Sequence, residues 1–148
     1  MEYQVKTAHG TLFCRREGSG PLLLLIHGVA CDSEFFREAS AILSKKFTVI
    51  SYDRRGYSRS IPAEGETDFS VWAHADDAAE IIGAEPKRKH EEEICLEESE
   101  PQMNGAEEQS KVKDGQNTGV FVAGCSAGGA VAAALATKYP ELVRQVFL

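Results

Sequence analysis

A serine between two glycines is the feature of this chain best suited to covalent chemistry. The stretch from Gly119 to Pro140 reads GVFVAGCSAGGAVAAALATKYP, an apolar run that breaks at Ser126 and restarts with helical composition. The valines and phenylalanine before the break are typical of a strand buried on both faces. The alanines after it favour a helix, which Pro140 cannot continue. We therefore expect a strand, a sharp turn at Ser126 and a helix.

Gly124 and Gly128 stand two residues on either side of this serine. A serine that turns from strand to helix within one residue has a strained backbone, and Cβ atoms two positions away would collide with the neighbouring chain. The helix behind such a turn directs free N–H groups and a partial positive charge at a reacting carbonyl. The pattern matches the G-x-S-x-G nucleophile elbow, and the alternative is a glycine-rich turn with an idle serine.

Length and composition limit the function classes. The 148 residues are enough for one domain, and the net charge is −7. Residues 85–117 carry ten acidic and five basic side chains, so the rest of the chain is nearly neutral. No basic patch supports binding of nucleic acid. We expect residues 84–117 to be a charged surface insertion without fixed structure, because so few apolar side chains cannot offset the ordering entropy.

The chain carries no sign of membrane insertion or of a metal site. Its amino terminus lacks the features of a signal peptide, and its longest purely apolar run, residues 22–26, is far shorter than the roughly 20 residues that cross a bilayer. The four cysteines form no CxxC pair and have no metal-ligand spacing. We expect reduced thiols, no cofactor, no metal and no membrane partner, in a soluble cytoplasmic protein.

The apolar pattern predicts alternating strands and helices. Residues 3–6 and 11–15 predict a hairpin, and residues 22–26 and 48–52 predict two strands buried on both faces. The helix expected between those two strands has one buried stripe, formed by Phe36, Ala39, Leu43 and Phe47. Strand, helix and strand form a βαβ unit, which makes the sheet parallel there.

A second helix is expected over residues 70–82, with Ser70 as its cap. Its buried face is predicted to be Val71, Ala75, Ala78 and Ile82. The polar side chains of this helix, His74, Asp76, Asp77 and Glu80, are expected to point into solvent. We assign His74 no catalytic role.

Three separated signatures follow one another along the chain: LLLLIHG at 22–28, SYDRRGYSRS at 51–60 and GCSAGG at 124–129. Together they resemble the α/β-hydrolase superfamily. The resemblance implies an α/β fold with a largely parallel sheet and flanking helices. It also implies Ser126 as the nucleophile and the backbone N–H groups of Val29 and Ala127 as the oxyanion hole.

The resemblance assigns lesser roles to other residues of these signatures. His27 is not the catalytic base of the family, and we expect it to hold its loop by hydrogen bonds. Members of the family often carry a second glycine where this chain has Ser58.

In the superfamily, the acid and the histidine of the catalytic triad follow the nucleophile in the chain. No histidine follows Ser126, and the sequence stops at Leu148, within what resembles the strand after the nucleophile helix. We therefore expect residues 1–148 to be the amino-terminal part of an α/β-hydrolase domain. The implied function is a serine hydrolase that transfers an acyl group from a small-molecule ester or amide carbonyl to water, inactive as this chain because its base is missing.

The alternative function is a non-catalytic half-domain or a decayed fragment that acts, if at all, through protein association. An exposed sheet edge would favour self-association.

Overall fold

The computed structural model describes residues 1–85 and 119–148. The elements in chain order are β1 (Glu2–Thr7), β2 (Gly10–Glu17), β3 (Leu22–Ile26), the 3₁₀ turn η1 (Ser33–Phe36), α1 (Arg37–Leu43), β4 (Thr48–Tyr52), β5 (Ile61–Pro62), α2 (Val71–Ala84), β6 (Val120–Gly124), α3 (Ala127–Lys138) and β7 (Val143–Phe147). The charged insertion expected at residues 84–117 falls almost entirely outside the described residues.

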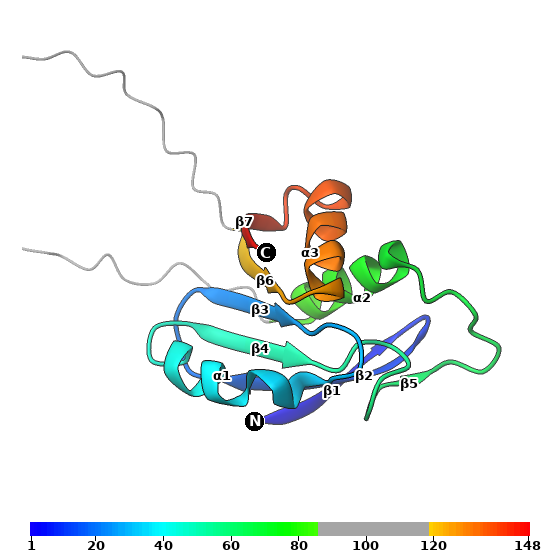
Figure 1. The fold of residues 1–148 in the computed structure, drawn as a ribbon, viewed down its shortest axis with the longest axis horizontal. Coiled ribbons are helices and arrows are strands. Elements are labelled where there is room, and N and C mark those ends of the chain that lie inside the picture. Colours follow the sequence, from blue (N-terminus) through cyan, green and yellow to red (C-terminus); the bar gives the residue numbers. More distant parts are fainter. Residues whose placement is uncertain (86–118) are drawn as a thin grey trace, which may run out of the picture.

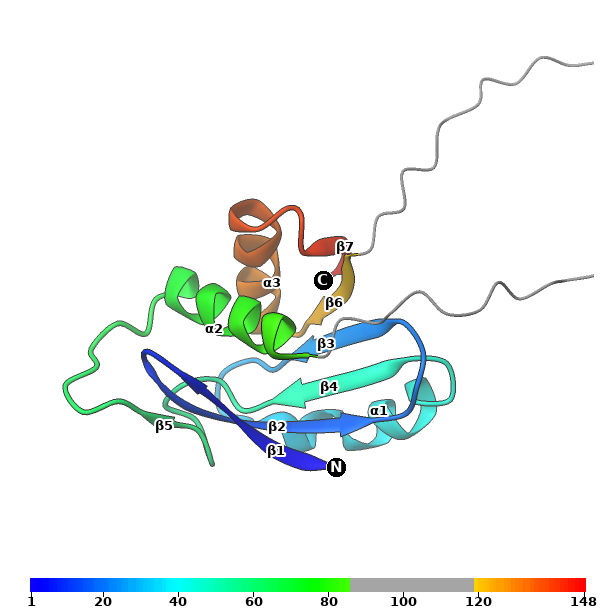
Figure 2. The same ribbon diagram turned by 180° about the vertical axis from the view of Figure 1, so that it is seen from behind.

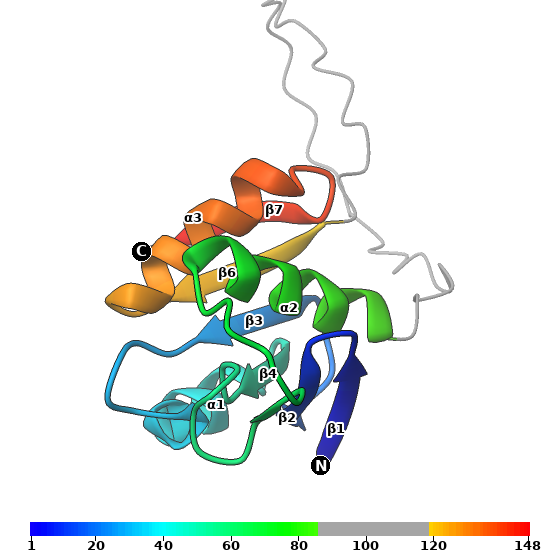
Figure 3. The same ribbon diagram turned by 90° about the vertical axis from the view of Figure 1, so that its right-hand side faces the viewer.

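The strands of the described residues all belong to one seven-stranded sheet. Its order is β1-β2-β4-β3-β6-β7, and β5 pairs with β2 beside that path. The hairpin strands β1 and β2 are antiparallel, and β2 is antiparallel to β4, whereas β4, β3, β6 and β7 run parallel to one another. Figure 3 shows these strands side by side, with the helices α2 and α3 across them. The α/β class and the largely parallel sheet are confirmed.

Helices cover both faces of this sheet. The helix α1 lies on one face, and α2 and α3 lie together on the other (Figures 1 and 2). The larger core fills the space between the sheet and α2 and α3, where Leu24, Ile50, Val122 and Leu135 are fully buried. A smaller core around Leu23, Leu25, Phe36 and Val49 lies under α1.

The helix α1 differs from its predicted stripe. Phe36 is buried and Leu43 is half-buried, as expected, but Ala39 is exposed and Ser40 is buried in its place. Ser40 lies four positions after Phe36 and three before Leu43, so it shares their face of the helix. The prediction for Ala39 is wrong because positions three and four residues after Phe36 both fit the helical period, and the apolar one of the two is not the one that is buried.

The helix α2 begins as predicted, since the Ser70 side chain accepts a hydrogen bond from the backbone N–H of Ala73 at 3.2 Å. The prediction of a solvated polar face is wrong for two of its members. Asp77 is fully buried and His74 is 4% exposed. Local periodicity places Asp77 among polar neighbours, but its partner lies in another part of the chain.

That partner is Arg55, which follows β4. Its guanidinium forms a two-pronged ion pair with Asp77, with Nε to Oδ2 at 3.0 Å and Nη2 to Oδ1 at 2.7 Å. The same guanidinium donates to the carbonyl oxygens of Asp68 and Ala73. The side chains of Arg55 and Asp77 are 1% and 0% exposed, so the pair ties the loop after β4 to α2 in the interior.

An apolar groove lies on the α1 face of the sheet. It has a volume of about 290 Å³ and is lined by Leu23, Leu25, Leu43, Phe47, Phe121, Ala123 and Phe147. No helix of the described part of the chain covers β6 and β7 on this face (Figure 1). The groove is therefore open beside β7, whose only partner strand among the described residues is β6.

The buried pair gives a test of the packing. Replacing Asp77 by leucine removes the two-pronged partner of the buried Arg55 and leaves it, within the described residues, only one carboxylate contact, that of Nη1 with Glu66 at 3.1 Å. We expect this single change to lower the free energy of unfolding by up to about 3–5 kcal/mol. The double change Asp77→Leu with Arg55→Met should lower it much less, because no unpaired charge stays buried. Urea unfolding curves of the two variants measure the difference. Equal losses would contradict a role for the ion pair.

Candidate active site

The signatures from the sequence meet at one edge of the sheet. The strands β3, β4 and β6 are parallel neighbours, and their carboxyl ends carry His27 to Val29, Asp53 to Arg59 and Ser126 respectively. The chain passes from β3 to β4 on one side and to β6 on the other, so this is a point where the strand order reverses. Such points are where open α/β sheets bind ligands.

Ser126 occupies the predicted sharp turn. It lies between β6 and α3 with φ 55° and ψ −122°, a conformation that non-glycine residues rarely adopt. Its side chain is exposed. The turn therefore lifts the hydroxyl out of the sheet at the start of α3, as the spacing of the glycines predicted.

The two flanking glycines are required by their neighbours. A Cβ added to Gly124 would fall on the carbonyl oxygen of Gly128, and one added to Gly128 would fall on the carbonyl oxygen of Ile26. Neither neighbour is a flexible side chain, so the backbone would have to move. The predicted collision of Cβ atoms at both positions is confirmed.

The loop after β3 packs against the serine. A Cβ added to Gly28 would lie 3.1 Å from the Cβ of Ser126 and 3.6 Å from its Oγ. The backbone N–H of Cys125 donates to the carbonyl oxygen of Ile26 at 3.0 Å, which joins the two strand ends just before the turn. The backbone of Gly28 is thus next to the Ser126 hydroxyl, and Val29 is the residue that follows Gly28.

Two backbone N–H groups at this place have no acceptor within residues 1–85 and 119–148. At the start of α3, the N–H of Gly128 donates to Cys125 and the N–H of Gly129 donates to Ser126, which leaves the N–H of Ala127 unused. The N–H of Val29 also has no acceptor in that part of the chain, and the Val29 side chain is exposed. These are the two N–H groups that the sequence analysis predicted as the oxyanion hole.

His27 is buried and has both ring nitrogens engaged. Its Nε2 accepts the backbone N–H of Arg54 at 2.9 Å, and its Nδ1 lies 2.7 Å from the carbonyl oxygen of Gly28. Because Nε2 is an acceptor, the proton of the neutral ring is on Nδ1. Burial lowers the pKa of His27, which favours this neutral form. The arrangement supports the loop-holding role expected for His27.

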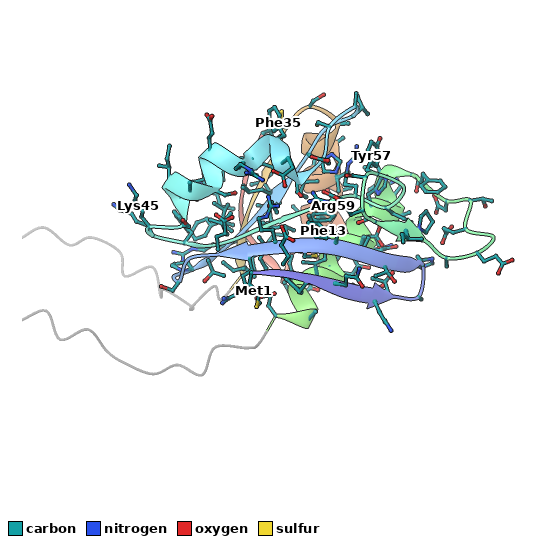
Figure 4. The ribbon with its side chains drawn as sticks, turned by 90° about the horizontal axis from the view of Figure 1, so that it is seen from below. Met1, Phe13, Phe35, Lys45, Tyr57 and Arg59 are labelled. Carbon is teal, nitrogen blue, oxygen red and sulfur yellow. The ribbon has the colours of Figure 1, made fainter. Side chains whose placement is uncertain are left out.

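A second network fixes the loop after β4. One carboxylate oxygen of Asp53 accepts the backbone N–H of Ser33 at 2.9 Å, and the other accepts Nε of Arg59 at 2.8 Å. The Arg59 guanidinium lies over the Phe13 ring at 3.8 Å, and Figure 4 shows the two residues together. Burial alone would raise the pKa of Asp53, but the bonds from Arg59 and Ser33 outweigh it and lower the pKa to about 2.

Ser58 lies in the same loop with φ 45°. Glycine adopts this conformation without strain, which fits the second glycine expected here from the resemblance to the superfamily. The loop keeps its turn with serine, and the backbone of the neighbouring Arg59 donates to Asp53 at 3.1 Å.

Sequence reasoning missed the roles of the arginines and of Tyr57. Arg54 lies over the Tyr57 ring at 4.4 Å, and the His27 ring contacts the same tyrosine with centroids 5.1 Å apart. The one available signal was the density of cations between Asp53 and Ser60, which a solvated loop does not need. No three His, Cys, Asp or Glu side chains of the described residues are placed to hold a metal ion.

Comparison with known proteins supports the same fold. Residues 21–89 match the family model of the alpha/beta hydrolase fold. An uncharacterized hydrolase, YraK, of Bacillus subtilis is 42% identical over 65 residues, which are 44% of this chain and 24% of that protein. The 2-(acetamidomethylene)succinate hydrolase of Mesorhizobium japonicum is 40% identical over 72 residues, 49% of this chain and 25% of that protein.

A solved structure extends the likeness to nearly the whole chain. The crystal structure of E-2-(acetamidomethylene)succinate hydrolase superposes with a TM-score of 0.69 at 29% identity, covering 99% of this chain and 42% of that one. Sheet order and these matches agree, and the chain has the alpha/beta hydrolase fold. It corresponds to the amino-terminal part of that fold. It spans about a quarter of the two curated hydrolases named above and about two fifths of the solved structure.

The Asp53 network predicts how stability depends on pH. The folded pKa of about 2 lies below the unfolded value of about 3.9. The Asp53 carboxylate therefore stabilises the fold above pH 4, and this contribution is lost as the pH falls from about 4 to about 2. Urea midpoints of the wild type and Asp53→Asn should differ most at pH 5 to 7 and converge at pH 2. A constant difference would contradict the prediction.

Proposed function

We propose that this chain carries the nucleophile and the oxyanion site of a serine hydrolase. Ser126 Oγ attacks the carbonyl carbon of a small-molecule ester or amide, and the N–H groups of Val29 and Ala127 stabilise the oxyanion that forms. The observation that carries the proposal is the strained turn at Ser126, with the unpaired Ala127 N–H in the next residue and Gly28 packed against its side chain. The relatives named as hydrolases support the class of reaction.

We expect no catalytic turnover by this chain alone. No histidine follows Ser126. Of the other histidines that the structure describes, His27 has both ring nitrogens occupied, His74 is buried beside Asp77, and His9 is bound to Glu66. Without a base the hydroxyl is a weak nucleophile, and the loss of such a histidine in subtilisin costs on the order of 10⁶ in turnover.

The proposal also covers the domain organisation, the absence of a cofactor and the cellular location. We treat residues 1–148 as one partial hydrolase domain that needs no cofactor or metal. Cys14, Cys31 and Cys125 are free thiols, which supports a reducing compartment such as the cytoplasm. No helix within residues 1–85 and 119–148 is long and apolar enough to span a membrane.

Acetylation by excess p-nitrophenyl acetate tests the proposal. Ser126 Oγ forms a bond to the acetyl carbon, p-nitrophenolate leaves, and the serine proton passes to the buffer. Deacylation also lacks a base, so the acetyl group should stay. Peptide mass spectrometry should find acetyl on Ser126 in preference to Ser58, which is also exposed and also has a positive φ.

The steady-state rate of p-nitrophenolate release should be the same for the wild type and for Ser126→Ala. The wild type should differ only by an initial burst of at most one equivalent. Equal acetylation of Ser58 and Ser126 would contradict the nucleophile assignment. Sustained turnover that Ser126→Ala abolishes would show that another group acts as the base.

A second candidate function is protein association without catalysis, and the open groove on the α1 face favours it. The groove is lined by apolar side chains, and Phe147 at its border is 48% exposed. An uncovered apolar surface next to an unpaired strand edge is characteristic of an interaction surface.

Light scattering tests this candidate. The wild-type chain should run larger than its 16.1 kDa monomer, because the groove and the β7 edge are open. Phe147→Glu should shift it toward the monomer. The control Phe35→Glu changes an aromatic residue of similar exposure outside the groove and should not. A monomeric wild type, or equal effects of both variants, would contradict association through the groove.

A further inference from the structure

The carbonyl oxygen of Gly28 accepts two hydrogen bonds from buried side chains. Nδ1 of His27 lies 2.7 Å from it, and Nη2 of Arg54 donates to it at 2.8 Å. Both side chains are almost entirely buried. One of the two donors carries a full charge, which makes its bond about twice as strong as a neutral one.

The same two residues also bind each other. The backbone N–H of Arg54 donates to Nε2 of His27 at 2.9 Å, which places the ring proton on Nδ1, facing Gly28. The Arg54 guanidinium is further held over the Tyr57 ring at 4.4 Å. His27, Arg54 and Tyr57 therefore form one interlocked group behind the Gly28 carbonyl.

Arg54 differs from its neighbours in having no carboxylate partner among the described residues. Arg55 is paired with Asp77, and Arg59 is paired with Asp53. Within residues 1–85 and 119–148, the Arg54 side chain donates to the Gly28 carbonyl alone, and its Nε is buried without a hydrogen bond. In the interior the local dielectric is low, and no counter-ion screens the Arg54 charge. Its field therefore acts strongly on the peptide dipole of the carbonyl that it contacts.

The peptide bond transmits this contact to Val29. The group that joins Gly28 to Val29 is planar and, like every described peptide bond of the chain, not cis, so its C=O and N–H point in opposite directions. Fixing the carbonyl oxygen on the side of His27 and Arg54 fixes the Val29 N–H on the other side. Polarisation of the carbonyl also makes that N–H a stronger donor.

We propose that Arg54 is a positioning residue of the oxyanion site. Together with His27 it holds the Gly28–Val29 peptide in one orientation, with the Val29 N–H presented beside Ser126, and places an unneutralised positive charge behind that peptide. The orientation itself is independent of the proposed function. Its use in stabilising an oxyanion rests on that function.

Backbone dynamics of the full chain test the orientation without any activity. The ¹⁵N order parameter of Val29 should be about 0.85 in the wild type, the value of rigid backbone, although its N–H has no protein acceptor and its side chain is exposed. The variant Arg54→Met keeps the length of the stem and loses the donors, and should lower the value toward about 0.6. Arg54→Lys keeps a charged donor and should restore part of it.

Arg16→Met is the matched control, because Arg16 is bound to Glu85 away from this site. It should leave the Val29 order parameter unchanged. If Arg54→Met does not fold, the wild type alone decides: a Val29 order parameter below about 0.6, or a His27 ring with its proton on Nε2 in ¹⁵N spectra, would overturn the proposal. So would a rigid Val29 in folded Arg54→Met.

Acetylation tests the use of that orientation. The ratio of acetyl on Ser126 to acetyl on Ser58 should fall at least about tenfold in Arg54→Met, since the loss of one oxyanion donor costs about 10²–10³ in related chemistry. It should recover in part in Arg54→Lys and stay constant in Arg16→Met. An unchanged ratio in folded Arg54→Met would overturn the proposal. Absence of a Ser126 preference in the wild type would instead overturn the proposed function, while the order parameters still decide the positioning role.

Discussion

The close approach of three backbone segments is the constraint on which the site depends. The end of β3, the end of β6 and the first turn of α3 come together so tightly that Gly124 and Gly128 have no room for a Cβ. The cost of this approach is the strained Ser126 backbone between them. In return, backbone groups of two segments far apart in the sequence lie next to one hydroxyl. Only residues without side chains allow that geometry, and the pattern of glycines is therefore visible in the sequence.

The loops around this contact are held by charge, and each arginine of the loop after β4 has a different role. Arg55 reaches inward and ties the loop to α2 through Asp77. Arg59 lies across the loop and neutralises Asp53, which in turn fixes the start of η1 through Ser33. Arg54 turns to the loop after β3 and contacts the Gly28 carbonyl. The three contacts together hold the loop against α2, η1 and the proposed oxyanion site, although the short strand β5 is the loop's only regular structure.

These contacts mark the limit of what the sequence reveals. The strands at 22–26 and 48–52, the cap at Ser70 and the elbow at Ser126 follow from local patterns, and each was predicted. The burial of Asp77 was not, because its partner is 22 positions away and a helix periodicity treats every carboxylate as solvated. Ser40 was missed because a hydrophobic period selects the apolar Ala39, although Ser40 lies nearly as well on the face of Phe36 and Leu43. In both cases the pattern treats a polar side chain as solvated, and its burial is decided by tertiary packing that a period of 3.6 residues does not contain.

The proposed site separates two requirements of acyl transfer. Stabilisation of the oxyanion needs only backbone N–H groups in fixed positions. In the proposed site these groups lie just after the ends of the neighbouring strands β3 and β6. Removal of the serine proton needs a side chain with a free nitrogen or oxygen within hydrogen-bond reach. His27 lies next to Gly28, which packs against the serine, but both of its ring nitrogens are bound to Gly28 and Arg54. The same bonds that fix the Val29 N–H therefore prevent His27 from acting as the base, so the two tasks must fall to different residues.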